Sequence, residues 1–463
     1  MGAAAGTAQQ AGPRRTTAPS GVYRPRRPQA SPLYRLIEDN FDEFCTVYDE
    51  RFARRWGYWR KVVGEVVEKF QACGILKHGF ARVRCGSCKH EFLLAFSCKC
   101  RYFCPSCHAK RLALWGIWLE ETLLADVPHR QVVLAVPKRL RPFFLYDRKL
   151  LGELSRVAAR TVTAFIRATV GEKDLSVGIV SSIQTHGSLA NWHPHLHLLV
   201  TDGGFRPDGT FVHLPLHDVA TLTEAFRRAV LKMFVKRELL DIETAQGMLA
   251  WPHSGFHVHD GVWASAEDKE FTVRLARYCA RNPVALGRME YDEQQSSVTY
   301  HSDKHTGPTA GSEITDALEF LAKLTSHIPN KGQVLQRYYG WYSSRQRGKR
   351  RQAAEQNDDY EQPPLVTVEP EPEALQKARR RWAQLIRSIF EVDPLACPRC
   401  GEEMRIVAFI TEPKVIDRIL DHMRRTRTSP RRQRAPPRRW KSATSTASAS
   451  SHTENHGRSS TRG

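Results

Sequence analysis

Residues 191–200 constrain the fold more than any other segment, because histidine alternates there with apolar residues. Alternate residues of a β-strand point to the same face. Leu196 and the apolar residues after it would therefore fill a buried face, and His195 and His197 would lie together on the other. Neighbouring residues on one face are about 6.8 Å apart, a gap that two imidazoles can close on one ion. The segment predicts a strand that carries a divalent-metal site.

A third ligand should come from a neighbouring strand, and Gln184 is our first choice, followed by His186 and His193. Two histidines at this spacing are more often packing residues than ligands, so the alternative of a purely structural strand stays open. The pattern also recurs at His257 and His259, where the long apolar continuation is missing. We therefore rank that second pair below the first.

Tyr278 is the candidate nucleophile, on a helix that the apolar spacing predicts over residues 268–281. It falls at the seam between an apolar arc and a basic arc that could bind DNA phosphate. The basic arc consists of Arg274, Arg277 and Arg281. A metal and a tyrosine among arginines suggest attack on a DNA phosphate, giving a 5′-phosphotyrosine. The competing tyrosines are Tyr300, Tyr338 and Tyr339.

Two cysteine pairs, Cys85/Cys88 and Cys104/Cys107, are separated by 15 residues. Pairs at this spacing can converge tetrahedrally on one Zn²⁺, and we expect that zinc to be structural. Cys98 is the foremost additional ligand candidate. The other candidates are Cys73, Cys100, His78, His90 and His108.

Cys397 and Cys400 form a third pair with no visible partner pair nearby. His422 could contribute, but a complete site is not evident. An incomplete zinc knuckle and a relic of one are equally good interpretations.

The net charge of +21 favours a nucleic-acid partner. Within this sequence no apolar run approaches the length of about 20 residues that spans a bilayer, and the N-terminus lacks the apolar core of a signal peptide. We therefore expect neither a membrane partner nor secretion. No Gly-x4-Gly-Lys-[Ser/Thr] loop occurs, so ATP is not implied.

The fold class we expect is α+β, with an antiparallel sheet and flanking helices preceded by a zinc-binding module. Strands are predicted at 130–136, 177–184 and 194–201, and a hairpin turn at 207–209. Helices are predicted at 112–124, 147–170, 217–240, 268–281 and 312–327. The expected parts are a disordered arm (1–30), a helical and zinc-binding module (31–125), a catalytic domain (126–350), an acidic linker (353–376), a small C-terminal element (377–422) and a basic disordered tail (424–463).

These motifs resemble the insertion-sequence 91 family of transposases over about residues 35–412. The resemblance rests on the cysteine region Cys85–Cys107, the run His193-Pro194-His195-Leu196-His197, Arg274–Tyr278, and Tyr338-Tyr339-Gly340. It implies an HUH endonuclease domain, single-stranded DNA transesterification and rolling-circle transposition of a mobile element. His195 and His197 would then bind Mg²⁺ or Mn²⁺, and Tyr278 would be the nucleophile.

Founding members of that family carry two tyrosines four residues apart, whereas Arg274 occupies the earlier place in this chain. The chain is therefore similar to the single-tyrosine, common-region (ISCR-type) branch. Strand transfer would then need another tyrosine, a second subunit, or reuse of Tyr278. The implied partners are transposon ends and host helicase or replication proteins, and the implied location is the bacterial cytoplasm, at the nucleoid.

Two functions of other classes remain as alternatives. The first is a zinc-dependent DNA-binding protein without catalysis, in which the histidines only pack. The second is a metal-dependent nuclease that activates water and forms no covalent intermediate.

Overall fold

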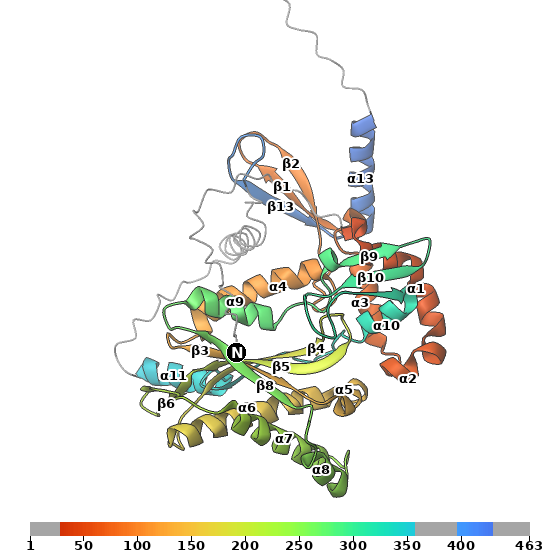
Figure 1. The fold of residues 1–463 in the computed structure, drawn as a ribbon. Coiled ribbons are helices and arrows are strands. Elements are labelled where there is room, and N and C mark those ends of the chain that lie inside the picture. The colour runs from red at the N-terminus through yellow and green to blue at the C-terminus, as the bar shows by residue number, and fades with distance from the viewer. Residues whose placement is uncertain (1–27, 357–395, 429–463) are drawn as a thin grey trace, which may run out of the picture. The chain divides into compact units, whose positions relative to one another are not determined.

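The computed structural model describes residues 28–356 and 396–428 (Figure 1). The predicted arm (1–30), linker (353–376) and tail (424–463) lie mostly outside these residues. The chain divides into a large unit, Met1–Ile416, and a small one, Asp417–Gly463.

A five-stranded antiparallel sheet lies at the centre of the large unit, in the order β12-β4-β5-β3-β8. Its strands are β3 (His129–Ala135), β4 (Gly178–His186), β5 (Trp192–Thr201), β8 (His257–Ala264) and β12 (Gln336–Gly340). The three predicted strands are confirmed as β3, β4 and β5. The strands at the two edges, β8 and β12, were not predicted.

Helices cover both faces of this sheet (Figure 1). Helices α6 (Lys149–Val170) and α7 (Val219–Lys236) cover one face, and α4 (Pro105–Trp118) and α9 (Lys269–Cys279) cover the other. Local signals set their ends. The carboxylates of Asp218 and Asp268 accept backbone N–H bonds at the starts of α7 and α9, and Gly171 ends α6 at φ 83°. The helices predicted at 147–170, 217–240 and 268–281 are therefore confirmed.

Two helix predictions need correction. Residues 312–327 do not form one helix, because Ser312–Asp316 is strand β11 and α10 spans Ala317–Thr325. The Asp316 side chain caps α10 by accepting from the N–H groups of Leu318 and Glu319. The helix expected at 112–124 begins earlier, at Pro105, and continues as a π-helical turn over Leu119–Leu123.

The N-terminal helices are not a separate module. Helices α1 (Pro32–Arg51), α2 (Ala53–Trp56) and α3 (Lys61–Gln71) share a buried core with α10 and with the hairpin of β9 (Met289–Asp292) and β10 (Ser297–His301). Asn40 Nδ2 donates to Tyr291 Oη at 2.8 Å, and Arg60 Nη1 donates to the Ile328 carbonyl at 2.6 Å. The predicted boundary between modules at residue 125 therefore does not separate two cores.

A second, three-stranded sheet has the order β13-β1-β2. Strands β1 (Phe80–Cys85) and β2 (Glu91–Ala95) form a hairpin, and β13 (Met404–Ile410) pairs antiparallel with β1 from Phe80↔Ile410 to Cys85↔Met404. The described part of the element expected at 377–422 is thus not independent. It adds an edge strand to an N-terminal sheet.

Smaller elements complete the described chain. They are α5 (Arg141–Tyr146), β6 (Gly203–Phe205), β7 (Phe211–His213), α8 (Ile242–Leu249), α11 (Ser344–Gln356), α13 (Pro413–Thr428), and 3₁₀ turns at Pro28–Ala30, Leu76–His78, Lys138–Leu140 and Leu286–Arg288. The hairpin turn predicted at 207–209 is confirmed between β6 and β7. Within residues 28–356 and 396–428, no helix combines the length and apolar character of a membrane span.

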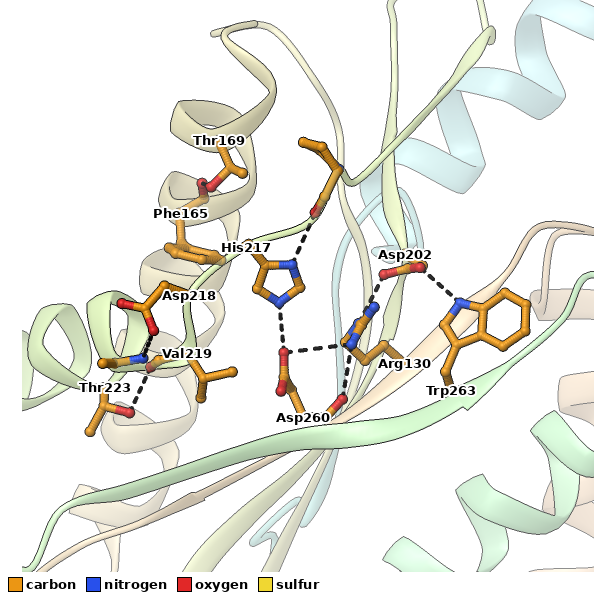
Figure 2. A network of polar contacts seen from close by, with 12 residues as sticks. Arg130, Phe165, Thr169, Asp202, His217, Asp218, Val219, Thr223, Asp260 and Trp263 are labelled. Carbon is orange, nitrogen blue, oxygen red and sulfur yellow. Dashed lines mark hydrogen bonds and ion pairs between the residues drawn. The ribbon is translucent and has the colours of Figure 1, made fainter.

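A buried polar network ties β3, β5 and β8 together on the sheet face that packs against α6 and α7 (Figure 2). Arg130 Nε donates to Asp202 Oδ1 at 2.9 Å, and Arg130 Nη1 lies 3.7 Å from Asp260 Oδ2. His217 Nε2 meets Asp260 Oδ2 at 2.7 Å, and Trp263 Nε1 donates to Asp202 Oδ2 at 2.8 Å. The single guanidinium therefore balances two carboxylates that have little access to water.

Replacing Arg130 by leucine should lower the free energy of unfolding by about 3–5 kcal/mol, because Asp202 and Asp260 would stay buried without their cation. Their side chains are 11% and 8% exposed. The matched control is Arg206→Leu, whose partner Glu172 is 35% exposed and whose loss should cost no more than about 1 kcal/mol. Urea unfolding measures both values, and equal losses would contradict the assignment.

Candidate active site and metal centres

The two histidines of β5 converge on one point. His195 and His197 lie on the sheet face covered by α9, and their Nε2 atoms are 3.0 Å apart. The Nδ1 of His195 donates to the His193 carbonyl at 2.7 Å. This bond leaves the lone pair of His195 on Nε2, the atom that faces His197. The predicted pair is therefore brought together, as a site for one divalent ion requires.

Burial keeps these imidazoles uncharged. It lowers the pKa of His195 to about 4, and it also lowers the pKa of His197, with the neighbouring His195 adding to the effect. Both rings are therefore neutral at neutral pH, which is the form that binds metal ions.

Gln184 on β4 is paired with His195 on the neighbouring strand β5. Its Nε2 donates to the Cys279 carbonyl at 2.7 Å, so its amide oxygen is the atom it could offer as a ligand. The second-choice ligands are also placed nearby. His186 and His193 each have a buried Nε2 with no hydrogen-bond partner among the described residues. Within the part of the chain that the structure describes, neither His186 nor His193 forms with His195 and His197 a group whose ligand atoms all lie within 4.8 Å of one another, so Gln184 stays the first choice for the third ligand.

Gln131 on β3 is a site residue that the sequence analysis missed. Its Nε2 lies 2.9 Å from Nδ1 of His197 and donates to Sγ of Cys279 at 3.2 Å. A half-turn of this amide exchanges its nitrogen and oxygen; the oxygen would then accept from His197 Nδ1–H and leave the Nε2 lone pair of that ring for a metal. Burial raises the pKa of Cys279 to about 12, so its thiol keeps its proton and could donate to the turned oxygen. Gln131 shares the parity of Val133, which pairs with His197, and this is the signal that could have identified it.

Tyr278 stands beside the histidines. It occupies the last turn of α9, its ring centroid is 6.2 Å from that of His197, and 51% of the residue is exposed. The Arg281 guanidinium lies 5.0 Å from the centroid of the Tyr278 ring and pairs with Asp303 at 2.7 Å. The phenol is therefore near the imidazole pair and accessible to a ligand from solvent.

The competing tyrosines are engaged elsewhere. Tyr300 is 1% exposed, and its hydroxyl accepts from the Ala285 N–H. Tyr338 Oη accepts from Trp115 Nε1 at 2.7 Å, and Tyr339 Oη bonds Ser155 Oγ at 2.8 Å. These three phenols have structural partners, whereas Tyr278 combines exposure with proximity to the histidines.

The three arginines of the predicted basic arc have different surroundings, and Arg281 lies just beyond the end of α9. Arg281 is the one that stacks on the Tyr278 ring. Arg274 is exposed and lies 5.2 Å from the ring centroid of Phe271. Arg277 is exposed and runs over Gly116 of α4, where an added Cβ would lie 2.9 Å from its Cδ. Arg274 and Arg277 are thus exposed cations on the surface, whereas the Arg281 guanidinium packs over the Tyr278 ring.

The second histidine pair is not part of this cluster. His257 and His259 are both exposed on β8, separated from β5 by the intervening strand β3. Their register still places them on the same sheet face as His195 and His197.

The cysteines form two tetrathiolate groups, and their grouping differs from the prediction. Cys73, Cys98, Cys104 and Cys107 form the first, and Cys85, Cys88, Cys397 and Cys400 form the second. In each group the four sulfurs lie within 4.8 Å of one another. The prediction that Cys85/Cys88 and Cys104/Cys107 share one ion is therefore wrong.

Strand geometry explains the error. Cys85 ends β1 and Cys88 lies in the turn that follows, at the end of the sheet where Met404 begins β13. Cys104 lies immediately before α4, beside Cys73 at the end of α3, and Cys73 Sγ is 3.8 Å from Cys107 Sγ. Cys98 joins this first group, 3.5 Å from Cys107, which keeps it as a candidate ligand. The pair Cys397/Cys400 therefore has a complete partner pair, without His422.

Comparisons with known proteins identify the chain as a transposase. A family model described as "Transposase zinc-binding domain" matches residues 43–136, and one described as "Putative transposase" matches residues 178–350. The transposase for insertion sequence element IS801 of Pseudomonas savastanoi pv. phaseolicola is 29% identical over 374 residues, which cover 77% of this chain and 86% of that protein. The chain belongs to the insertion-sequence 91 family of transposases.

A second relative of this transposase, "Putative transposase y4qJ" of Sinorhizobium fredii (strain NBRC 101917 / NGR234), is 25% identical over 292 residues, covering 57% of this chain and 70% of the relative. No solved structure is significantly similar to the chain. As a transposase, the protein acts on DNA at the ends of its element. The matched zinc-binding region contains the whole of the first cysteine group, whose four thiols are the donor set that structural zinc sites use.

Replacing Cys73 by serine should weaken zinc binding by the transposase and destabilise the α3–α4 region, because it removes one of four thiolates. The matched control is Cys100→Ser, since Cys100 is buried beside the first group but is not a member of it. Competition with a chromophoric chelator measures the affinity. Unchanged affinity in Cys73→Ser, or an equal loss in both variants, would contradict the ligand set.

Proposed function

We propose that this transposase nicks and rejoins single-stranded DNA at element ends through a 5′-phosphotyrosine on Tyr278, during rolling-circle transposition by an HUH-type endonuclease. The observation that carries the proposal is the approach of the Tyr278 ring to His197, at 6.2 Å between centroids, on an accessible surface. A nucleophile at that place could reach a phosphodiester held beside the imidazole pair.

The proposed reaction exchanges one ester bond for another. The phenolic oxygen of Tyr278 attacks phosphorus, and the bond from phosphorus to the 3′ oxygen breaks. The phenol gives up its proton, and the departing oxygen takes one up to become a 3′-hydroxyl. Attack of a 3′-hydroxyl on the phosphotyrosine reverses the step and joins DNA. Because the bond energy is conserved in the intermediate, rejoining needs no ATP.

Three side chains would hold the divalent ion: His195, His197 and Gln184 through its amide oxygen. Two nitrogens bound at right angles to one ion at about 2.1 Å lie about 3.0 Å apart, and the two Nε2 atoms are separated by 3.0 Å. When bound, Mg²⁺ or Mn²⁺ would polarise a non-bridging phosphate oxygen. The remaining task of the protein is to hold these donors in place, and Gln131 and the His193 carbonyl contribute to it.

Charge supports a nucleic-acid substrate. The chain carries a net charge of +21, and Arg274 and Arg277 are exposed on the helix that bears Tyr278. Arg281 could offset charge on the attacked phosphate from its position over the phenol.

No ATP-binding loop of the Gly-x4-Gly-Lys-[Ser/Thr] type occurs, so a host helicase would supply the single strand. We place this action at the nucleoid in the bacterial cytoplasm.

Replacing Tyr278 by phenylalanine should abolish the covalent protein–DNA adduct, because the attacking oxygen is gone. The assay incubates the full chain with end-labelled single-stranded DNA from an element end and Mn²⁺ or Mg²⁺, and resolves adducts by denaturing electrophoresis. The matched control is Tyr58→Phe, because Tyr58 is 78% exposed and lies on another part of the chain. It should form the adduct at the wild-type level.

Each other outcome of this assay identifies another function. An adduct that persists in Tyr278→Phe would place the nucleophile on a different residue. Cleavage without any adduct would indicate a nuclease that activates water. DNA binding without cleavage, by wild-type protein loaded with metal, would indicate a DNA-binding protein that lacks catalysis.

The metal site gives a second prediction. His195→Ala and His197→Ala should abolish cleavage and leave DNA binding largely intact, whereas His259→Ala, on the same face but outside the cluster, should cleave normally.

Gln131→Leu should raise the Mn²⁺ concentration for half-maximal cleavage about 10–100-fold, because His197 loses the partner that orients it. Gln131→Glu keeps an acceptor oxygen and should retain the wild-type requirement. Equal loss of binding and cleavage in the histidine variants would contradict separate roles.

A further inference from the structure

We propose that Cys85, Cys88, Cys397 and Cys400 bind a second zinc ion, which fastens the C-terminal strand β13 to the N-terminal strand β1. The matched zinc-binding region ends at residue 136 and holds only two of these four ligands. The site is therefore distinct from the first cysteine group, and it makes the C-terminal segment a structural part of an N-terminal sheet.

The sulfur positions fit zinc and do not fit disulfides. Cys85 Sγ lies 3.6 Å from Cys400 Sγ, and Cys88 Sγ lies 3.4 Å from Cys397 Sγ. Four sulfurs at about 2.3 Å from a tetrahedral zinc would be about 3.8 Å apart, whereas bonded sulfurs would be about 2.05 Å apart. The spacing is close to that of a tetrathiolate around one ion.

The backbone repeats the same turn at both pairs. The residue that follows the second cysteine has a positive φ in each turn, 60° at Lys89 and 76° at Gly401. The N–H of the first cysteine also donates across its own turn, from Cys85 to the His90 carbonyl and from Cys397 to the Glu402 carbonyl, both at 2.8 Å. Two matched turns that face one another present all four sulfurs to a common centre, as paired zinc knuckles do.

Apolar burial alone gives this sheet little support. Its core contains the fully or largely buried residues Val83, Cys85, Cys397 and Met404, with a few partly buried neighbours. On β13, Val407 and Phe409 are 52% and 56% exposed. A strand with so small a buried face, whose first residue Met404 pairs with Cys85 319 residues earlier in the sequence, needs another source of stability. A structural zinc ion provides it, because binding the metal and ordering the ligands are one event.

The test counts zinc ions on the full-length protein by native mass spectrometry, checked by elemental analysis. Wild type and Cys45→Ser should hold two ions per chain, since Cys45 is exposed and outside both groups. Cys397→Ser/Cys400→Ser should lose one ion, and Cys85→Ser/Cys88→Ser should lose one ion. A variant that combines all four substitutions should also lose one and no more, because both pairs serve the same ion.

A full zinc content in Cys397→Ser/Cys400→Ser would overturn the proposal, since Cys85 and Cys88 would then have other partners, such as Cys104 and Cys107. A single ion in wild type would overturn it as well.

Hydrogen exchange separates loss of this site from general unfolding. In Cys397→Ser/Cys400→Ser, the amides of Phe80–Cys85 should exchange faster while those of α10 and β4 keep their wild-type protection. Uniform loss of protection from hydrogen exchange would mean general unfolding and would contradict a zinc site that stabilises only this sheet. None of these readouts depends on DNA cleavage.

Discussion

The hydrogen bond from Gln184 Nε2 to the Cys279 carbonyl fixes the end of α9 on the central sheet. Because Tyr278 directly precedes Cys279, this contact sets where the phenol can lie relative to His197. The Gln131 amide, 3.2 Å from the Cys279 sulfur, adds a second attachment from β3. One helical turn advances about 5.4 Å, so a slip of α9 by a single turn would remove the tyrosine from the imidazoles. The proposed chemistry thus depends on two amides that hold one short stretch of helix.

Local signals in the sequence were sufficient for the centre of the fold. Alternation of apolar and polar residues identified β5 and the shared face of His195 and His197, because strand periodicity is an intrinsic property of the backbone. Helical spacing of apolar residues identified α7 and α9, whose first turns are capped by Asp218 and Asp268. The placement of Tyr278 at a seam of α9 followed from the same periodicity. Its distance from the histidines did not, since that depends on how α9 packs across the sheet.

Features that depend on distant partners were missed or wrongly assigned. The prediction of helix for Ser312–Asp316 was wrong because the pairing of this segment with β10 is not visible in the local pattern. The boundary expected near residue 125 failed because α1 and α3 bury their apolar faces against residues 284–328. Cysteine spacing gave the wrong partners for Cys85 and Cys88. Spacing describes a turn, whereas grouping depends on which turns the tertiary fold brings together.

The pairing of β13 with β1 also has a consequence for how the protein is made. During synthesis the β1–β2 hairpin leaves the ribosome long before Met404 and the strand that follows it. Until then, Cys85 and Cys88 are two exposed thiols at an open sheet edge. A polypeptide interrupted before Met404 would lack this last edge strand and would keep an open sheet edge, which can pair with another chain. Completion of this sheet therefore waits for residues 404–410, and it couples the stability of the amino-terminal region to translation of a much later part of the chain.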